Sequence, residues 1–206
     1  MSKVETHQPN PSESLSDGEL MELVRKHDQS AFDILIRRHE EKLYHLAWSI
    51  VRNREDASDI VQEVFFTIWD NPGVWKPKQS VLSKKQVKFT TWLFRVTTNR
   101  SLNAQRSKKL KSFLSFSNDK ESEVFGEAVS QPNKEVPDQA LIQQEESQTF
   151  EVAFAKLAPK QKAAIHLRYR ENLSVGEVAK SLDVSYKSAE SLLFRGKARM
   201  KELLTQ

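Results

Sequence analysis

Residues 89–100 read FTTWLFRVTTNR, a stretch that combines aromatic, cationic, hydroxyl and amide side chains. Its apolar residues recur at intervals of three and four, which predicts an amphipathic helix that runs to about Arg106. On a helical projection one side is apolar and holds Phe89, Trp92, Leu93 and Val96, and another side is polar and basic and holds Thr91, Arg95, Thr98, Asn99 and Arg106.

This helix lies within a longer basic segment. Residues 71–118 contain eleven Lys and Arg and not a single Asp or Glu. Such a composition suits a groove that follows a nucleic-acid backbone and stacks unpaired bases on aromatic rings. The alternative is an ordinary amphipathic helix whose aromatic side chains belong to the core and whose cations are solvated.

The sign of the charge alternates along the chain. The formal net charge is +4, but residues 119–151 carry a balance of −7 and residues 156–201 a balance of +7. Two basic blocks separated by an acidic one predict two nucleic-acid contacts, joined by a segment that does not bind the same surface.

Composition argues against several classes of protein. The absence of cysteine excludes disulfides, thiolate metal sites and cysteine nucleophiles. The five histidines lack the spacing of metal ligands, and the five glycines form no phosphate-binding loop. No stretch approaches the roughly 18 apolar residues of a membrane span, and residues 1–16 are polar. We therefore expect a cytoplasmic protein that is not an enzyme, with no metal, no cofactor and no membrane insertion.

The spacing of apolar residues predicts an all-α fold. Ser16 and Glu19 fit a capping box that starts a short helix. Helical spacing then predicts one helix over about 31–53 and another over about 55–69, which ends at the Asn-Pro-Gly of residues 71–73. No segment alternates in the manner of a strand.

Changes in composition divide the chain into two small helical domains. We expect a disordered tail at residues 1–15 and a first domain at 16–110. A flexible linker at 111–138 follows, and a second domain occupies 139–206.

The second domain ends in the pattern of a helix-turn-helix. A helix over 160–170 is followed by a capping box at Ser174 and Glu177, a three-residue turn that contains Asp183, and a longer helix capped by Ser185. The alternative is a helical hairpin with no role in DNA binding. In the helix-turn-helix, Lys187, Ser188, Ser191 and Arg195 face the DNA, and Ala189, Leu193, Gly196 and Met200 face the two preceding helices.

Three segments resemble a known family. Residues 56–65, DASDIVQEVF, are similar to region 2.2 of the bacterial sigma-70 family, in its small, two-domain extracytoplasmic-function (ECF) type. Residues 89–102 resemble regions 2.3 and 2.4, and residues 157–204 resemble region 4. The segments occur in the family's order, with a linker where the family has one. The resemblance implies a subunit without catalysis of its own that binds core RNA polymerase, directs it to promoters and helps to open the duplex.

The resemblance also implies three sets of functional residues. Five residues of the third helix contact the polymerase clamp, and the acids among them recur at three- and four-residue steps. Taken alone, these acids could also be favourable charges at a helix N-terminus. The basic helix binds the minus-ten element as a single strand, with one base flipped into a pocket built within residues 71–88. The second domain binds the minus-thirty-five element as duplex and contacts the polymerase flap. The sets are Asp56, Asp59, Ile60, Gln62 and Glu63 for the clamp; Phe89, Trp92, Arg95, Asn99, Arg100, Asn103 and Arg106 for minus-ten; and Ser174, Lys187, Ser188, Ser191, Arg195 and Lys197 for minus-thirty-five.

Some positions depart from the family pattern. Asn103 stands where Asp is frequent, and Glu190 and Leu192 stand where cations are common. These changes indicate an unusual promoter preference, or a face of the last helix that is turned towards another protein. The resemblance further implies that the protein is held inactive either by packing of its two domains or by an anti-sigma factor, and the sequence leaves this choice open.

Two other functions compete with this interpretation. A stand-alone helix-turn-helix regulator would use the N-terminal helices for dimerisation or sensing, but a protein that binds only duplex DNA needs neither the 56–65 signature nor the aromatic, basic helix. An anti-sigma or adaptor protein would not need two basic blocks.

Overall fold

The computed structural model describes residues 14–76, 88–116 and 149–205, and these residues contain helices and no strand. The N-terminal unit consists of α1 (Asp17–Val24), α2 (Gln29–Val51), α3 (Arg54–Asp70), the short 3-10 helix η2 (Pro72–Val74) and α4 (Phe89–Phe116). The C-terminal unit consists of a helix over 149–155, α6 (Pro159–Ile165), the π-helical turn η3 (His166–Arg170), α7 (Val175–Ser181) and α8 (Tyr186–Leu204). The all-α prediction is confirmed. The tail up to residue 13 and most of the expected linker lie outside the described residues.

Side-chain caps fix where the first helices begin. The Ser16 hydroxyl accepts a hydrogen bond from the Glu19 backbone N–H at 3.3 Å, and the Glu19 carboxylate accepts one from the Ser16 N–H at 2.8 Å. The predicted capping box is therefore present. Asn53 caps α3 through its side-chain oxygen, which accepts a hydrogen bond from the Asp56 N–H at 2.9 Å.

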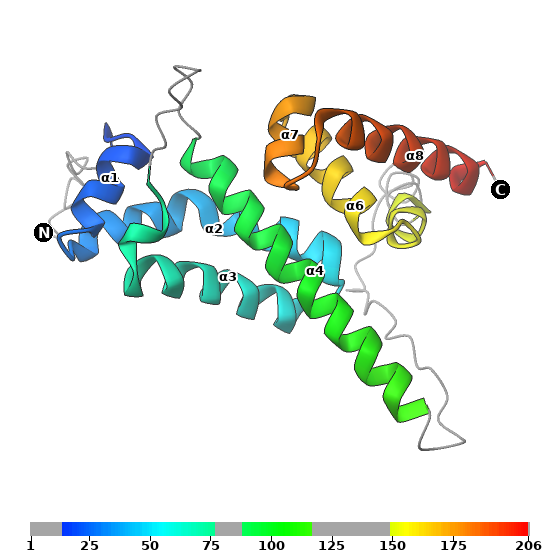
Figure 1. Ribbon diagram of the computed structural model, residues 1–206, viewed down its shortest axis with the longest axis horizontal. Coiled ribbons are helices and arrows are strands. Elements are labelled where there is room, and N and C mark those ends of the chain that lie inside the picture. The colour runs from blue at the N-terminus through cyan, green and yellow to red at the C-terminus, as the bar shows by residue number, and fades with distance from the viewer. Residues whose placement is uncertain (1–13, 77–87, 117–148, 206) are drawn as a thin grey trace, which may run out of the picture.

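The helices α2, α3 and α4 pack against one another and enclose the core of the N-terminal unit (Figure 1). The apolar stripes predicted for these helices point inwards, and the largest fully buried side chains there include Leu35, Leu43, Leu46, Ile50, Ile68 and Leu93. None of the helices in the described ranges is long and apolar enough to cross a membrane.

The predicted end of the basic helix at about Arg106 is wrong. α4 continues for ten more residues, to Phe116, and Figure 1 shows its C-terminal end projecting beyond α3. Residues 107–116 are rich in Ser and Lys, but they contain neither Gly nor Pro to stop a helix. Lys108 also forms an ion pair with Asp56 of α3, so a tertiary contact holds the first turn of the extension.

The C-terminal unit contains the predicted helix-turn-helix. Asp183, in the turn between α7 and α8, has a left-handed backbone with φ of 53°. Ala189, Leu193, Gly196 and Met200 form the buried side of α8, as predicted. A Cβ atom at Gly196 would lie 2.8 Å from Cδ1 of Ile165, so the glycine lets α8 approach α6 closely.

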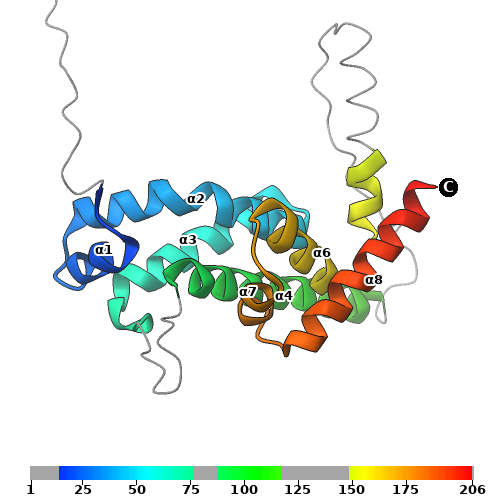
Figure 2. The same ribbon diagram turned by 90° about the horizontal axis from the view of Figure 1, so that it is seen from above.

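The two units are packed together. α6 contacts α2 and α4, and α7 contacts α4; both views show this arrangement (Figures 1 and 2). Ion pairs join the units at Arg52 and Glu151, 2.7 Å apart, and at Lys88 and Glu177, 3.3 Å apart. The sequence leaves open whether domain packing or an anti-sigma factor holds the protein inactive. The structure shows that the two domains do pack together.

Candidate protein and nucleic-acid interfaces

The exposed side of α3 carries three of the five residues predicted to bind polymerase. Asp59, Gln62 and Glu63 are exposed. Asp56 is partly buried, and Ile60 is 5% exposed and belongs to the core, where it supports this face from below. The exposed side also includes Phe66, which is 69% exposed one turn beyond Gln62. Phe66 was not among the residues predicted from the sequence. The helical repeat of apolar residues did offer a signal, because Phe65 falls on the buried side of the helix and Phe66 does not.

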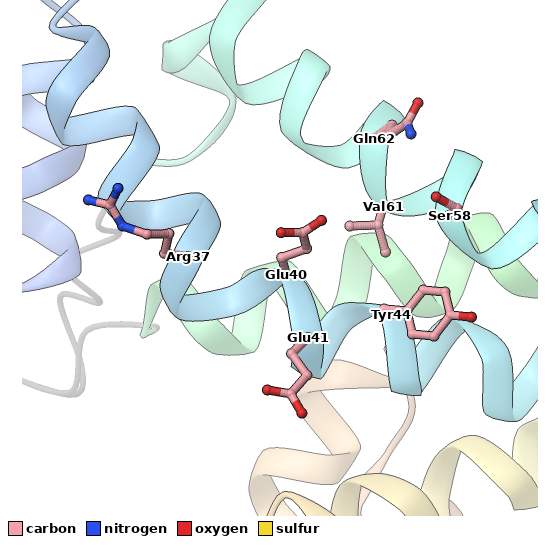
Figure 3. A pocket seen from close by; sticks show the side chains of 7 residues that line it. All are labelled: Arg37, Glu40, Glu41, Tyr44, Ser58, Val61 and Gln62. Atoms are coloured by element: carbon pink, nitrogen blue, oxygen red, sulfur yellow. The ribbon is translucent and has the colours of Figure 1, made fainter. Parts of the chain in front are cut away.

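A hollow of about 260 Å³ adjoins this side of α3 (Figure 3). In Figure 3 the Glu40 side chain of α2 points towards α3. Acids outnumber the single cation around the hollow, which suits a cationic protein surface. Sequence reasoning missed the α2 contribution because charges on the outer side of a helix resemble ordinary solvated residues. The hollow is lined by Arg37, Glu40, Glu41 and Tyr44 of α2 and by Ser58, Val61 and Gln62 of α3.

Two aromatic residues predicted to bind DNA lie in the core. Phe89 and Trp92 are 3% and 9% exposed, and their rings stack with centroids 5.9 Å apart. Phe89 also meets the rings of Trp75 and His39 edge to face, at 5.3 and 5.8 Å. In the packed arrangement these rings fix the start of α4 against the bundle and offer no open face to a base.

Four of the predicted minus-ten residues form an exposed stripe on α4. The stripe consists of Arg95, Asn99, Asn103 and Arg106, which recur at helical spacing on one side. The two arginines have no ion-pair partner among the described residues. A stripe of two cations and two amides can follow a phosphate backbone while the amides reach bases.

The C-terminal unit packs against part of α4. Lys88, which directly precedes α4, is paired with Glu177 of α7. Thr91 and Thr98 are 6% and 0% exposed, although the sequence places them on the polar side of α4. The Thr98 hydroxyl is buried without a hydrogen-bond partner in the described parts of the chain. The packing of α7 therefore limits access to part of α4.

The last predicted set lies mainly on α8, and its side chains there are open to solvent. Lys187, Ser188, Ser191, Arg195 and Lys197 are all exposed. Ser185 caps the helix by accepting a hydrogen bond from the Ser188 N–H at 3.1 Å. The Arg195 Nε donates to the Ser191 carbonyl at 3.3 Å, which keeps the guanidinium along the helix.

Further residues refine this picture of α8. Phe194 is 75% exposed beside Arg195, and sequence reasoning missed it. Of the two departures from the family pattern, Glu190 is exposed, whereas Leu192 packs against the core. Ser174 caps α7, and hydrogen bonds from its backbone and hydroxyl lower the pKa of Glu177.

Fold and surfaces together define a class: an all-helical DNA-binding protein with a helix-turn-helix and a separate acidic face for a protein partner. Residues 35–111 match the family model for Sigma-70 region 2, and residues 147–200 match the model for Sigma-70, region 4. The chain belongs to the sigma-70 family and is an ECF sigma factor. It directs promoter-specific transcription by RNA polymerase and is not an enzyme, which excludes the stand-alone regulator.

Curated relatives match along most of their length. The chain is 28% identical to the ECF RNA polymerase sigma factor SigW of Bacillus subtilis over 187 residues, which cover 88% of this chain and 92% of SigW. It is 27% identical to the ECF RNA polymerase sigma-E factor of Escherichia coli, with 90% of this chain and 93% of the relative covered.

Two solved structures share the fold. One is CnrH in complex with the cytosolic domain of CnrY, with a TM-score of 0.61, 23% identity, and coverage of 92% of this chain and 97% of the other. The second is the sigma factor RpoE in complex with the anti-sigma factor NepR from Bartonella quintana, with a TM-score of 0.59, 20% identity, and coverage of 84% and 96%.

Proposed function

We propose that this sigma factor divides promoter recognition among three surfaces. The acidic side of α3, with the adjoining hollow, binds the clamp of core RNA polymerase. The stripe on α4 binds the minus-ten element as a single strand, and α8 binds the minus-thirty-five element as duplex. The polymerase-binding and minus-ten surfaces belong to a first domain that starts at residue 16 and, because α4 runs to Phe116, extends beyond the expected boundary at residue 110. The duplex-binding surface belongs to a domain at 139–206, and the residues between the two domains form the linker.

The observation that carries the docking assignment is the group of exposed acids around the hollow. Asp59 has no ion-pair partner among the described residues, and Glu40 and Glu41 flank the hollow from α2. Exposed charges of one sign increase the rate and specificity of association with a surface of opposite sign. Phe66, which is exposed on α3, adds an apolar contact to this polar surface.

At the minus-ten element, Arg95 and Arg106 bind the backbone of the opened strand while Asn99 and Asn103 contact bases. Flipping one base costs a few kcal/mol, which stacking and a fitted pocket offset. The pocket belongs to the segment between residues 71 and 88, of which 77–87 lie outside the described residues. Phe89 and Trp92 support this surface by anchoring α4.

At the minus-thirty-five element, the N-terminal half of α8 lies in the major groove. Lys187, Ser188 and Ser191 face base edges and phosphates there, and Arg195 binds a phosphate further along the helix. Ser174 and Lys197 contact the flanking backbone. The same domain contacts the polymerase flap, which places the two DNA elements on one polymerase.

The packed arrangement is the inactive form of the isolated protein. Because α7 packs against α4, we expect the two domains to separate when a strand binds along α4. The structural neighbour RpoE is bound to an anti-sigma factor in its solved structure, and CnrH is bound to the cytosolic domain of CnrY. We propose that an anti-sigma factor also binds this protein and keeps it inactive in the cytoplasm until a signal releases it.

Co-purification with core polymerase followed by run-off transcription on a pool of promoter fragments tests the proposal. The wild-type protein should bind core and produce discrete new transcripts. Asp59→Asn combined with Glu40→Gln should weaken core binding, while Glu22→Gln, an exposed acid on α1, should not. Equal binding by the double variant and the control would remove the docking assignment, and duplex binding without core binding would contradict the proposal as a whole.

A further inference from the structure

Two ion pairs join α3 to α4 along their contact. Arg100 of α4 pairs with Glu63 of α3, and Lys108 of α4 pairs with Asp56 of α3. The helices are antiparallel, so the earlier α4 cation meets the later α3 acid. The proposed docking face and the proposed minus-ten helix therefore share charged residues, and two of the predicted polymerase-binding acids already have a partner within the chain.

The contacts of Arg100 are more specific than those of Lys108. Arg100 Nη1 donates to the Glu63 carboxylate, and Nη2 donates to the Thr67 hydroxyl at 2.8 Å. That hydroxyl in turn donates to the Glu63 backbone carbonyl at 2.7 Å. The planar guanidinium thus spans one turn of α3 with both terminal nitrogens, a geometry that the single ammonium of a lysine cannot reproduce.

Arg100 also differs from the arginines of the stripe. Arg95 and Arg106 are exposed and have no ion-pair partner among the described residues, whereas Arg100 is paired with Glu63 and its side chain is 34% exposed. To move away from α3 and reach a DNA phosphate, Arg100 would have to break both of these hydrogen bonds. Arg95 could bind a phosphate at no such cost.

We propose that Arg100 is a positioning residue, which ties the minus-ten helix to the polymerase-docking face instead of binding DNA. The inference rests on the proposed function of those two surfaces. It revises the assignment of Arg100 to the minus-ten set and gives Glu63 a second role. Because Glu63 contacts both polymerase and Arg100, docking and the orientation of α4 are energetically linked, and each influences the other by the same factor.

The test uses holoenzyme reconstituted with saturating sigma factor on a promoter fragment that is pre-opened at the minus-ten element. Affinity is measured over a range of salt concentrations for Arg100→Gln, Arg100→Lys and Thr67→Val, with Arg95→Gln as the matched control.

A lost phosphate contact reduces the slope of log affinity against log salt by about 1, and we expect this for Arg95→Gln. For Arg100→Gln we expect a several-fold loss of affinity with an unchanged slope. Thr67→Val should add nothing to the Arg100→Gln loss, and Arg100→Lys should not restore binding. A slope reduced by about 1 in Arg100→Gln, or recovery in Arg100→Lys, would show that Arg100 binds phosphate.

A second measurement separates this inference from the proposed function. A double-mutant cycle of Arg100→Gln and Glu63→Gln on urea unfolding of the full chain requires no polymerase. We expect a coupling of roughly two- to fivefold in the unfolding equilibrium constant, the usual range for a partly exposed pair. If the two substitutions showed no coupling, the proposed bridge from Arg100 to Glu63 of α3 would be contradicted. Coupling in a protein that failed to bind core would leave the bridge in place and contradict the proposed function.

Discussion

The two helices proposed to read DNA are prepared for that task in different ways. α4 is part of a core: its aromatic residues are buried, Arg100 and Lys108 are paired with α3, and α7 covers one side. α8 buries one narrow stripe and leaves Lys187, Ser191 and Arg195 open. The surface proposed to bind duplex DNA is therefore open in the free chain, whereas the helix proposed to bind a single strand is partly covered by the protein itself.

The largest effect should come from exchanging the aromatic residues of the two helices for alanine. Trp92→Ala on α4 should lower the free energy of unfolding by about 3–5 kcal/mol, because it removes a large buried side chain. Phe194→Ala on α8 should change it by less than about 0.5 kcal/mol, because the side chain is exposed. Urea unfolding measures both. A small effect of Trp92→Ala together with a strong loss of single-strand binding would instead support the prediction that Trp92 stacks on bases.

A buried lysine at the contact between the units should give the next largest effect. Lys162 on α6 is 4% exposed, and its ammonium group has no ion pair or hydrogen bond to a described residue. Burial, with the nearby Arg52 and Lys109, lowers its pKa from 10.5 to about 8. Burying the protonated ammonium therefore costs free energy and weakens the packing of the two units. This cost is fully present below pH 8 and disappears as the pH rises from about 8 to 10.5. Solvent screening reduces it to roughly 1–2 kcal/mol.

Lys162→Met should tighten the packing by that amount and remove its pH dependence in this window. Binding of the free protein to single-stranded minus-ten DNA should fall, while duplex binding by α8 stays the same. Fluorescence anisotropy with the two DNA probes measures both. The control is Lys160→Met, which replaces an exposed lysine on the same helix. If both probes lost affinity equally, packing would affect the two DNA surfaces alike and the contrast between α4 and α8 would disappear.

Arg195→Ala should produce a smaller effect, confined to α8. Duplex affinity should fall several-fold, with a salt slope reduced by about 1, because one phosphate contact is lost. Stability should not change, because the guanidinium is exposed. A change in sequence preference with an unchanged slope would move Arg195 from a phosphate contact to a base contact.

The smallest effect concerns the ion pair between Lys88 and Glu177. The Lys88 side chain is 72% exposed, and exposed pairs contribute less than about 1 kcal/mol. Lys88→Gln should therefore leave the packing of α7 on α4 nearly unchanged in a urea titration. A loss as large as that of Trp92→Ala would show that this pair, and not the close packing of helices, holds α7 in place.

Local sequence predicted where helices begin better than where they end. Ser16, Ser174 and Ser185 cap their helices as expected because a cap depends on residues only three positions apart. The end of α4 was missed because the contact between Lys108 and Asp56 joins residues 52 positions apart. Composition typical of a linker is compatible with a helix when no Gly or Pro interrupts it.

The candidate sites were predicted only in part for a similar reason. Helical period identified Asp59 and Glu63 as one side of α3, and it grouped Phe89 with Trp92. Period alone could not decide whether an apolar side faces a core or a base, and the structure places these two rings in the core. The hollow beside α3 and the bridge at Arg100 depend on neighbours from other helices, which no local pattern shows.

The most direct test of the central claim is the distance between α7 and the N-terminal unit before and after assembly. The chain has no native cysteine, so Lys180→Cys and Asp70→Cys, both exposed, can carry a donor and an acceptor dye without further changes. If α7 packs on α4 only in the free chain, the free protein should show one high energy-transfer efficiency, with a clear decrease when core polymerase and promoter DNA are added. An efficiency that stays the same in the active complex would show that α4 reads the promoter with α7 still packed against it, and would contradict the account.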